Sequence, residues 1–243
     1  MTRLFNGIVA FGSALLLAVA LIGAGYAAVA IPDAATATLS RAYSGCDQPD
    51  TPFTADELAS MAIASKRYTF DDNDREKLDA AIAEANAAAE ADGRASASTR
   101  ESAARSLPAD AISHLDDVYH VASVAKPALV IVTALCIAGL AHVAVRINRR
   151  ALGRTLMAGS GLVLAAFCAL GAWAAIDFDG LFAAFHSLFF QAGTWTFPYD
   201  SLLITLYPTA FWMGMGGIWL AVTCGLSILA VLIGFTLGHK QHD

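Results

Sequence analysis

Four long stretches of the chain carry almost no charge, and this feature restricts the possible folds more than any other. The stretches cover residues 1–31, 127–145, 155–176 and 202–237. A bilayer core about 30 Å thick needs roughly 20 apolar residues in a helix, and each stretch is near or above that length. We therefore expect an all-α membrane protein with four transmembrane helices.

The composition agrees with a membrane protein. Hydrophobic residues make up 57% of the chain and charged residues only 15%, whereas a soluble domain is about 25% charged. The net charge of -6 and the absence of a basic stripe argue against nucleic-acid binding. The first stretch also fits a signal peptide with "YAAVA" as its cleavage site, and this alternative stays open.

Lysine and arginine predict the orientation of the spans. The loop 146–154 is rich in arginine, and the two ends of the chain are also basic. Because such segments stay in the cytoplasm, we expect both termini, including the tail 238–243, to be cytoplasmic. Segments 32–126 and 177–201 then lie outside. The basic residues are Arg3, Arg146, Arg149, Arg150, Arg154 and Lys240.

The larger outer segment, 32–126, holds 17 of the 21 acidic residues and 9 of the 15 basic ones. We expect a small helical cap outside the membrane. Thr54, followed three residues later by Glu57, is a capping-box pattern that starts a helix. The Ala-rich stretch 71–105 has few large apolar residues, which predicts an exposed helix followed by a flexible Ser/Gly region.

The shorter outer segment, 177–201, predicts a helix lying in the membrane interface. Phe178, Phe182, Phe185 and Phe189 follow one another at spacings of four, three and four, as on one side of an amphipathic helix. His186 lies beside this stripe. Aromatic belts are common at membrane interfaces, so the aromatic residues alone need no catalytic role.

Two histidines are predicted on the outer side, near the membrane plane. His114 precedes the second span and shares a helix face with Asp117, while His186 follows the third span. A histidine near its ordinary pKa can accept and return a proton. A neighbouring carboxylate such as Asp117 can fix its tautomer. The pair therefore predicts an acid–base site at the outer surface.

Other chemistries fit the sequence less well. His114, His186 and Asp117 could bind a metal, but no helix face carries a ligand pair such as HExxH. Ser113 and Ser187 adjoin the histidines in sequence, where helical neighbours do not face each other, and no GxSxG elbow is present. The four cysteines form no disulfide framework and no CxxC motif. We therefore expect no metal.

Two motifs resemble those of the lipoprotein intramolecular transacylase (Lit) family. The first is "HLDDV" before the second span, and the second is "FxxFHxxFF" after the third span, leading into W, D and P. The resemblance extends to the four-span topology with a large outer loop. Its residues are His114, Leu115, Asp117 and Val118, and Phe182, Phe185, His186, Phe189, Phe190, Trp195, Asp200 and Pro208.

This resemblance implies a bacterial, multi-pass cell-membrane enzyme that needs no cofactor. Its substrate is a diacylglyceryl-cysteine lipoprotein in the outer leaflet. The sn-2 acyl chain moves to the alpha-amino group of that cysteine, and the product is the lyso form. The family's two functional histidines map to His114 and His186. We expect His114 to be the base, poised by Asp117, in a monomeric protein.

The substrate's lipid chains are expected to approach from the side, through the aromatic residues of the second motif. The residues expected to contact substrate or lipid are Phe185, Phe189, Phe190, Trp195, Asp200 and Tyr119.

Three other classes of protein stay open. One is a non-catalytic membrane protein that binds lipid or a protein partner, and the second is a metal-dependent membrane hydrolase. The third, a small transporter, needs ionisable residues at midplane depth, and the spans hold few of them. The stretch 71–105 is longer than the resemblance leads us to expect.

Overall fold

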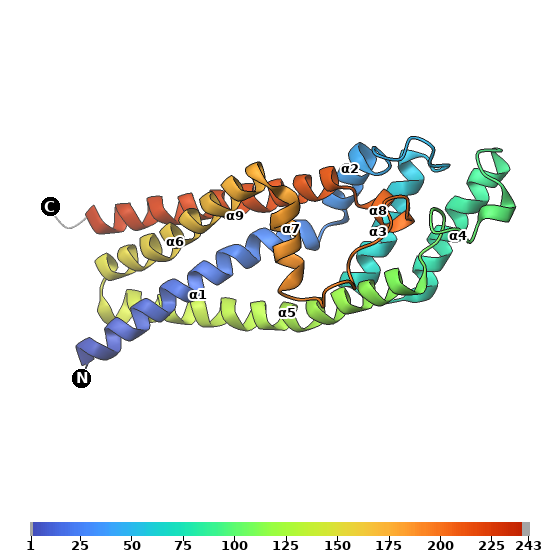
Figure 1. The fold of residues 1–243 in the computed structure, drawn as a ribbon. Helices are drawn as coiled ribbons and strands as arrows, with labels where there is room; N and C mark the ends of the chain where they lie inside the picture. The colour runs from blue at the N-terminus through green and yellow to red at the C-terminus, as the bar shows by residue number, and fades with distance from the viewer. Residues whose placement is uncertain (1, 240–243) are drawn as a thin grey trace. The chain divides into compact units, whose positions relative to one another are not determined.

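The protein is described by a computed structural model that covers residues 2–239. Within that range every regular element is helical (Figure 1), which confirms the all-α prediction. The predicted tail, 238–243, lies mostly outside the described residues. The helices are α1 (Thr2–Ala30), α2 (Asp33–Tyr43), α3 (Ala55–Phe70), α4 (Arg75–Ala91), η1 (Ala97–Thr99), α5 (Ala109–His142), η2 (Val143–Ile147), α6 (Arg149–Ile176), α7 (Phe178–Ser187), α8 (Leu202–Leu206) and α9 (Thr209–His239).

Four helices are long and apolar enough to cross a membrane, and they cover Arg3–Ala30, Ala109–Ile147, Arg149–Ile176 and Thr209–His239. The second is much longer than the predicted span 127–145, because α5 continues unbroken through Pro127. Membrane helices tolerate such a proline where neighbouring groups satisfy the freed backbone.

The apolar run 202–237 is divided into two helices. Tyr207 ends α8 with φ -129° and ψ 60°, outside the helical region, and Pro208 follows it. Proline disfavours a helical conformation in the residue before it, so the chain breaks here and α9 starts at Thr209. Leu202 and Leu206 of α8 are fully buried.

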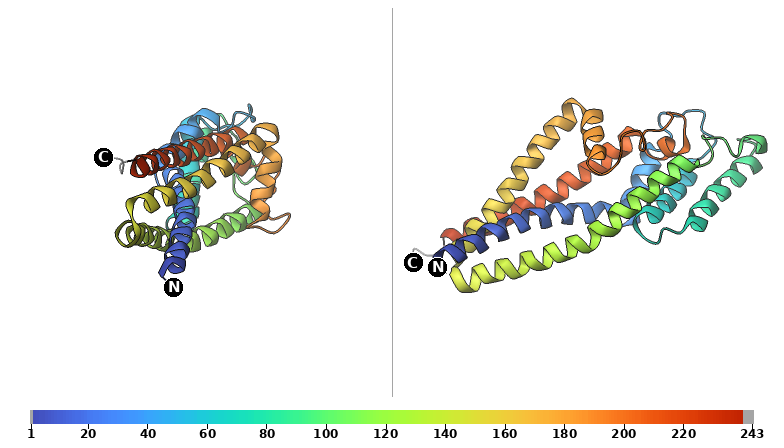
Figure 2. Two further views of the ribbon diagram at one scale, coloured as in Figure 1. Left: turned by 90° about the vertical axis from the view of Figure 1, so that its left-hand side faces the viewer. Right: turned by 60° about the horizontal axis from the view of Figure 1, so that its bottom comes forward.

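The chain forms two compact units. Unit 1 contains residues 1–28, 125–181 and 218–243, and unit 2 contains residues 29–124 and 182–217. Within unit 1, the first turns of α1, the connection between α5 and α6 and the last turns of α9 lie at the same end (Figure 2). These are the segments that carry Arg3 and the arginines of the loop 146–154.

Small residues bring the helices of unit 1 together. A Cβ at Gly153 of α6 would come within 2.4 Å of the Gly234 carbonyl oxygen of α9. A Cβ at Gly159 of α6 would come within 2.5 Å of the Ala14 carbonyl oxygen of α1. Such close backbone approaches are typical of helix packing in membranes, where small residues allow dense van der Waals contact.

The core of unit 2 is formed by α3, α4, the first turns of α5 and α8. Helix α4 contributes to it, so the prediction of an exposed helix within 71–105 is wrong. Its alanines and few large residues repeat at spacings of three and four and bury one face. The cluster includes Leu58, Met61, Leu78, Ile82, Ala85, Ala89, Ile112, Leu115, Leu202 and Leu206.

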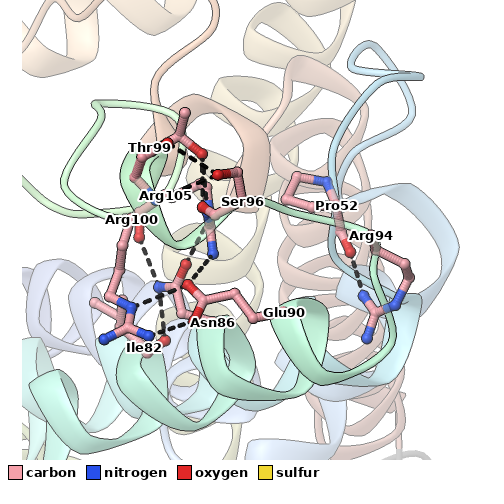
Figure 3. A network of polar contacts seen from close by, with 10 residues as sticks. Pro52, Ile82, Asn86, Glu90, Arg94, Ser96, Thr99, Arg100 and Arg105 are labelled. Carbon is pink, nitrogen blue, oxygen red and sulfur yellow. Dashed lines mark hydrogen bonds and ion pairs between the residues drawn. The ribbon is translucent and has the colours of Figure 1, made fainter.

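A buried arginine orders the segment that we expected to be flexible. Arg105 is 3% exposed, and its Nε donates to Asn86 Oδ1 at 2.8 Å. It also donates to Glu90 at 3.0 Å, to Thr99 Oγ1 at 2.9 Å and to the Ser96 carbonyl. Figure 3 shows these contacts tying residues 96–105 to α4.

The predicted capping box begins α3. Thr54 accepts a hydrogen bond from the Glu57 backbone, and the Glu57 carboxylate accepts one from the Thr54 backbone at 2.7 Å. Glu57 also binds the Arg94 guanidinium at 2.7 and 3.0 Å. These hydrogen bonds from Arg94 are the chief reason why the pKa of Glu57 lies below its ordinary value.

Candidate functional site

His114 lies near the start of α5, on the face that packs against the core of unit 2. Its neighbours Ile112 and Leu115 are buried in that core, and His114 itself is 8% exposed. The packing of the apolar residues around it therefore holds the imidazole in place. The rings of Phe190 and Phe197 lie 5.0 and 5.5 Å from the His114 ring, centre to centre.

His186 lies near the end of α7, and a backbone contact orients its ring. Its Nδ1 is 2.9 Å from the carbonyl oxygen of Phe182, one helical turn earlier. Because a carbonyl oxygen only accepts hydrogen bonds, Nδ1 carries the proton in the neutral ring. The lone pair of neutral His186 is consequently on Nε2.

Aromatic rings surround His186. The ring centres of Phe182 and Trp195 lie 4.0 and 4.9 Å from that of His186, and their planes are tilted from it by 35° and 32°. Phe185 and Phe190 are both 5.8 Å away. Burial among these rings lowers the pKa of His186 from its ordinary value of 6.5, while the contact with the Phe182 carbonyl acts in the opposite direction.

The two histidines come together in unit 2. Their ring centres are 6.2 Å apart, and the planes are tilted by 31°. Phe190 contacts both rings. The structure thus brings two imidazoles that are 72 positions apart in the sequence into one aromatic cluster. We call this set the histidine cluster: His114, His186, Phe182, Phe185, Phe190, Trp195 and Phe197.

Two buried polar atoms of the histidine cluster have no hydrogen-bond partner among residues 2–239. They are His114 Nδ1 and Trp195 Nε1. Buried polar groups in folded proteins nearly always have a partner, in the protein or in ordered water. The cluster therefore holds one imidazole nitrogen and one indole nitrogen whose hydrogen-bonding capacity the described residues leave unused.

Three of the predicted site residues lie apart from the cluster. Asp117 and Asp200 are exposed and Tyr119 is half-buried. The charge of Asp117 still acts on His114: burial and, to a smaller extent, His186 lower the pKa of that imidazole to about 4, and Asp117 opposes them by raising it. The neighbouring carboxylate of Asp116 accepts a hydrogen bond from the Tyr68 hydroxyl and one from Asn73 Nδ2 at 3.4 Å.

The lipid-facing residues of the prediction lie at the border of the cluster. Phe185 and Phe189 are 47% and 49% exposed, and their ring centres are 5.3 Å apart. Phe185 contacts His186, and Phe189 contacts Phe190 at 6.2 Å. The histidine cluster therefore has exposed aromatic rings on one border.

Two further aromatic contacts in this region could not be predicted from the sequence. Phe197 contacts His114, and Trp212 of α9 lies 5.8 Å from Phe182. Phe197 is visible in the sequence only as one more aromatic residue of an interfacial belt. Trp212 lies in the run predicted to be the fourth span. Neither carried a signal that separates it from its aromatic neighbours.

Residues 2–239 contain no group of three or more His, Cys, Asp or Glu side chains arranged to hold a metal ion. His114 and His186 are the two potential nitrogen ligands that lie together.

The helices and the histidine cluster define a multi-pass membrane protein with a site built around two histidines. Residues 92–212, which include both histidines, match the family lipoprotein intramolecular transacylase Lit. The chain belongs to this family, and it is accordingly an enzyme of the transacylase class. No curated protein sequence matches it.

Solved structures of Lit from Bacillus cereus have a similar fold. One matches with a TM-score of 0.73 and 18% identity, covering 98% of this chain and 97% of the other. Two variants of that protein, in which a histidine is replaced by arginine or alanine, match with TM-scores of 0.67. Their identity is also 18%, and they cover 99% of this chain and 95% and 96% of theirs.

Proposed function

We propose that this protein converts diacylglyceryl-cysteine lipoproteins to their lyso form. The sn-2 acyl chain moves from the glycerol oxygen to the alpha-amino nitrogen of the same cysteine. One ester bond breaks, one amide bond forms, and a free glycerol hydroxyl remains. Because donor and acceptor belong to the same substrate, the enzyme needs no nucleophile and no acyl carrier of its own.

The observation that carries this proposal is the pair of imidazoles 6.2 Å apart in an aromatic cluster. Acyl transfer to an amine needs a group that removes an amine proton and returns it to the departing oxygen. It also needs a donor that stabilises the oxyanion of the tetrahedral intermediate. Two histidines in different tautomeric states can divide these tasks between them.

The contact with Phe182 makes His186 the better candidate for the base. With Nδ1 donating to the Phe182 carbonyl, neutral His186 presents an unprotonated Nε2. This exchanges the roles that we expected from the sequence, where His114 was the base and Asp117 its partner. Asp117 is exposed, and its charge raises the His114 pKa by less than burial and His186 lower it, so it gives the earlier assignment only weak support.

His114 is then the electrophilic partner. Its buried Nδ1 has no hydrogen-bond partner within residues 2–239. In the tautomer with the proton on Nε2, the unpaired group at Nδ1 is an acceptor lone pair and not an N–H donor. Unpaired acceptors are somewhat less rare in proteins than unpaired N–H groups. In this tautomer Nε2–H is free to donate to the ester carbonyl oxygen.

The substrate and His186 together account for every bond and proton in the reaction. The neutral amine, whose ordinary pKa is about 7.7–8.0, attacks the ester carbon, and the carbonyl electron pair moves to oxygen. His186 Nε2 takes one amine proton. The oxyanion then re-forms the carbonyl as the bond to the glycerol oxygen breaks, and imidazolium returns the proton to that oxygen.

The proposed topology places the reaction at the outer membrane surface. The arginines gathered at one end of unit 1 support a cytoplasmic location for both termini. Helix α5, with 34 residues, is about 51 Å long and exceeds a bilayer core of about 30 Å. We propose that its first turns, with α2, α3 and α4, form an extracytoplasmic cap.

We further propose that α7 is the interfacial helix. Its exposed neighbours Leu188 and Phe189, at 76% and 49%, support contact with lipid. Acyl chains of the substrate remain in the outer leaflet while the cysteine and glycerol groups reach the histidine cluster. The reaction requires a single chain, and we expect a monomer.

The test is expression of the protein in a bacterial strain whose lipoproteins are only diacylated. Mass spectrometry of their N-terminal peptides is expected to show N-acyl, S-monoacylglyceryl cysteine. His114→Ala and His186→Ala are expected to abolish the conversion. His120→Ala is the matched control, because His120 lies in the same helix but is exposed.

Two results would overturn the proposal. One is a wild-type protein that is present in the membrane and converts nothing. The other is full conversion by both the His114→Ala and the His186→Ala variants. Loss of conversion in His120→Ala would show that the effect is not specific to the histidine cluster.

A further inference from the structure

Trp195 has an indole N–H that the fold buries and leaves unpaired. Trp195 lies in the connection after α7, and its ring centre is 4.9 Å from that of His186. Its Nε1 is covered by surrounding atoms and has no hydrogen-bond partner among residues 2–239. The connection turns at Gly193, whose φ of 89° favours glycine.

Trp219, which is half-buried like Trp195, shows the usual arrangement. Trp219 of α9, in unit 1, donates its Nε1–H to the Ile22 carbonyl at 3.1 Å. A buried indole N–H normally finds such a partner. Trp195 does not, although it lies beside an imidazole that we propose to be catalytic. The unpaired donor thus belongs to the region where a polar substrate group is needed.

We propose that Trp195 Nε1–H donates a hydrogen bond to the carbonyl oxygen of the acyl group that is transferred. This inference rests on the proposed function. The bond strengthens as the carbonyl electron pair moves to oxygen during attack by the amine, and it weakens when the carbonyl re-forms. No proton leaves the indole. Trp195 is therefore a catalytic residue, which extends its predicted role as a lining of the lipid path.

Trp195 and His114 both lie beside His186, with ring centres 4.9 and 6.2 Å from its ring, and in this proposal each donates to the same oxygen. Two donors aimed at the developing oxyanion stabilise it more strongly than one. The arrangement also leaves His186 free for proton transfer throughout. Because Trp195 Nε1 is covered, the oxygen reaches it only when neighbouring side chains shift.

The decisive experiment replaces the N–H and keeps the shape of the side chain. Purified full-length protein is assayed with a synthetic diacylglyceryl lipopeptide, and the rate of N-acylation is followed by mass spectrometry. Trp195 is replaced by 3-benzothienylalanine, in which sulfur takes the place of N–H. Trp195→Phe is made in parallel. Loss of one oxyanion donor is expected to lower kcat by about 100-fold or more, with KM changed much less.

Trp173→Phe is the matched control. Trp173 lies in α6 of unit 1 and is 43% exposed, so removal of its N–H is expected to leave kcat unchanged. A purely structural role of Trp195 predicts a loss of activity with Trp195→Phe but wild-type activity with 3-benzothienylalanine. Wild-type kcat in the benzothienyl variant therefore overturns the proposal.

The failures of the two proposals can be told apart. If the wild-type protein does not acylate the lipopeptide, the proposed function itself fails. If the wild type is active, His186→Ala is inactive and the benzothienyl variant is fully active, the transacylase reaction stands. In that case only the role of the Trp195 N–H is wrong.

Discussion

The aromatic rings around His186 affect its charge in two opposite ways. The ring centres of Phe182 and Trp195 lie 4.0 and 4.9 Å from that of His186, with the ring planes tilted by 35° and 32°. Their bulk excludes water, which disfavours the imidazolium. Their π-faces attract a cation, which reduces that penalty. His186 is therefore neutral at the start of the reaction and can still hold a proton briefly.

The first prediction concerns the protonation of His186. NMR titration of the histidine ring carbons is expected to give a pKa below 6.5 for His186, since burial lowers it. Phe190→Ala exposes the ring and is expected to move the pKa back toward 6.5. A midpoint above 6.5 in the wild type, or an unchanged midpoint in Phe190→Ala, would contradict this account.

The same shift affects stability. Below about pH 6.5 the unfolded chain binds a proton on His186 that the folded chain resists, so stability falls as the pH drops toward the folded pKa. Above about pH 6.5 His186 is neutral in the folded and the unfolded chain, so its contribution to the free energy of unfolding no longer changes with pH.

At the scale of elements, Arg105 connects α4 to the segment that leads into α5. Its guanidinium binds Asn86 and Glu90 on α4, and Asn86 in turn donates to the Arg105 carbonyl at 2.9 Å. The first turn of α5 begins four residues later. The network therefore helps to fix the start of the helix that carries His114.

The second prediction tests this network. Arg105→Met leaves the buried Asn86 Oδ1 without its donor, whereas Glu90 keeps its pair with Arg100. A buried acceptor left unpaired costs about 1–3 kcal/mol. Arg75→Met is the control, because Arg75 makes an exposed pair with Asp79 worth about 0.3–0.5 kcal/mol. Thermal unfolding in detergent is expected to show a large fall in the midpoint temperature for Arg105→Met and little change for Arg75→Met.

The third prediction concerns the pH dependence of the capping box. Hydrogen bonds from Arg94 lower the pKa of Glu57 below its ordinary 4.5. The stabilisation is therefore complete above pH 4.5 and is lost as the pH falls through the folded pKa. Glu57→Gln is expected to unfold at a lower temperature than wild type at pH 7. The difference is expected to shrink on acidification below pH 4.5.

Glu76→Gln is a suitable control for that experiment, since Glu76 is an exposed first-turn residue of α4. A Glu57→Gln variant as stable as wild type at pH 7 would show that the pair with Arg94 contributes nothing measurable.

The sequence predicted the start of a helix better than it predicted which side chains are buried or hydrogen-bonded. The capping box at Thr54 is a local pattern, and the structure confirms it. Burial of α4 was missed because its core face has only two large apolar residues, Leu78 and Ile82, among alanine and asparagine. Composition alone does not separate such a face from a solvated one. Asp116, rather than Asp117, is engaged because Tyr68 packs beside it. That choice depends on a contact 48 positions away, which helical spacing does not reveal.

At the scale of the whole molecule, apolar length identifies the membrane helices but not their partners. In unit 1 the partners meet at glycine, serine, threonine and alanine. A Cβ at Gly139 of α5 would meet Ser13 of α1 at 2.3 Å, and one at Gly25 of α1 would meet Thr223 of α9 at 2.0 Å. The sequence contains 19 glycines, and hydropathy does not show which of them lie at such contacts.

The fourth prediction separates two glycines of α9. Gly234→Ala places a Cβ 2.6 Å from the Gly153 carbonyl oxygen of α6, where backbone must move. Overpacking of this kind costs roughly 1–3 kcal/mol. At Gly225 an added Cβ meets nothing within 4 Å, and replacing a helical glycine by alanine gains up to about 1 kcal/mol.

Thermal unfolding of both variants in the same lipid mixture measures the difference. Gly234→Ala is expected to unfold at a lower temperature than wild type, and Gly225→Ala at the same or a higher temperature. Equal stability of the two variants would mean that α6 and α9 do not meet at these backbones. The packing of unit 1 would then depend on the larger side chains, such as Phe167 against Trp219 at 5.2 Å.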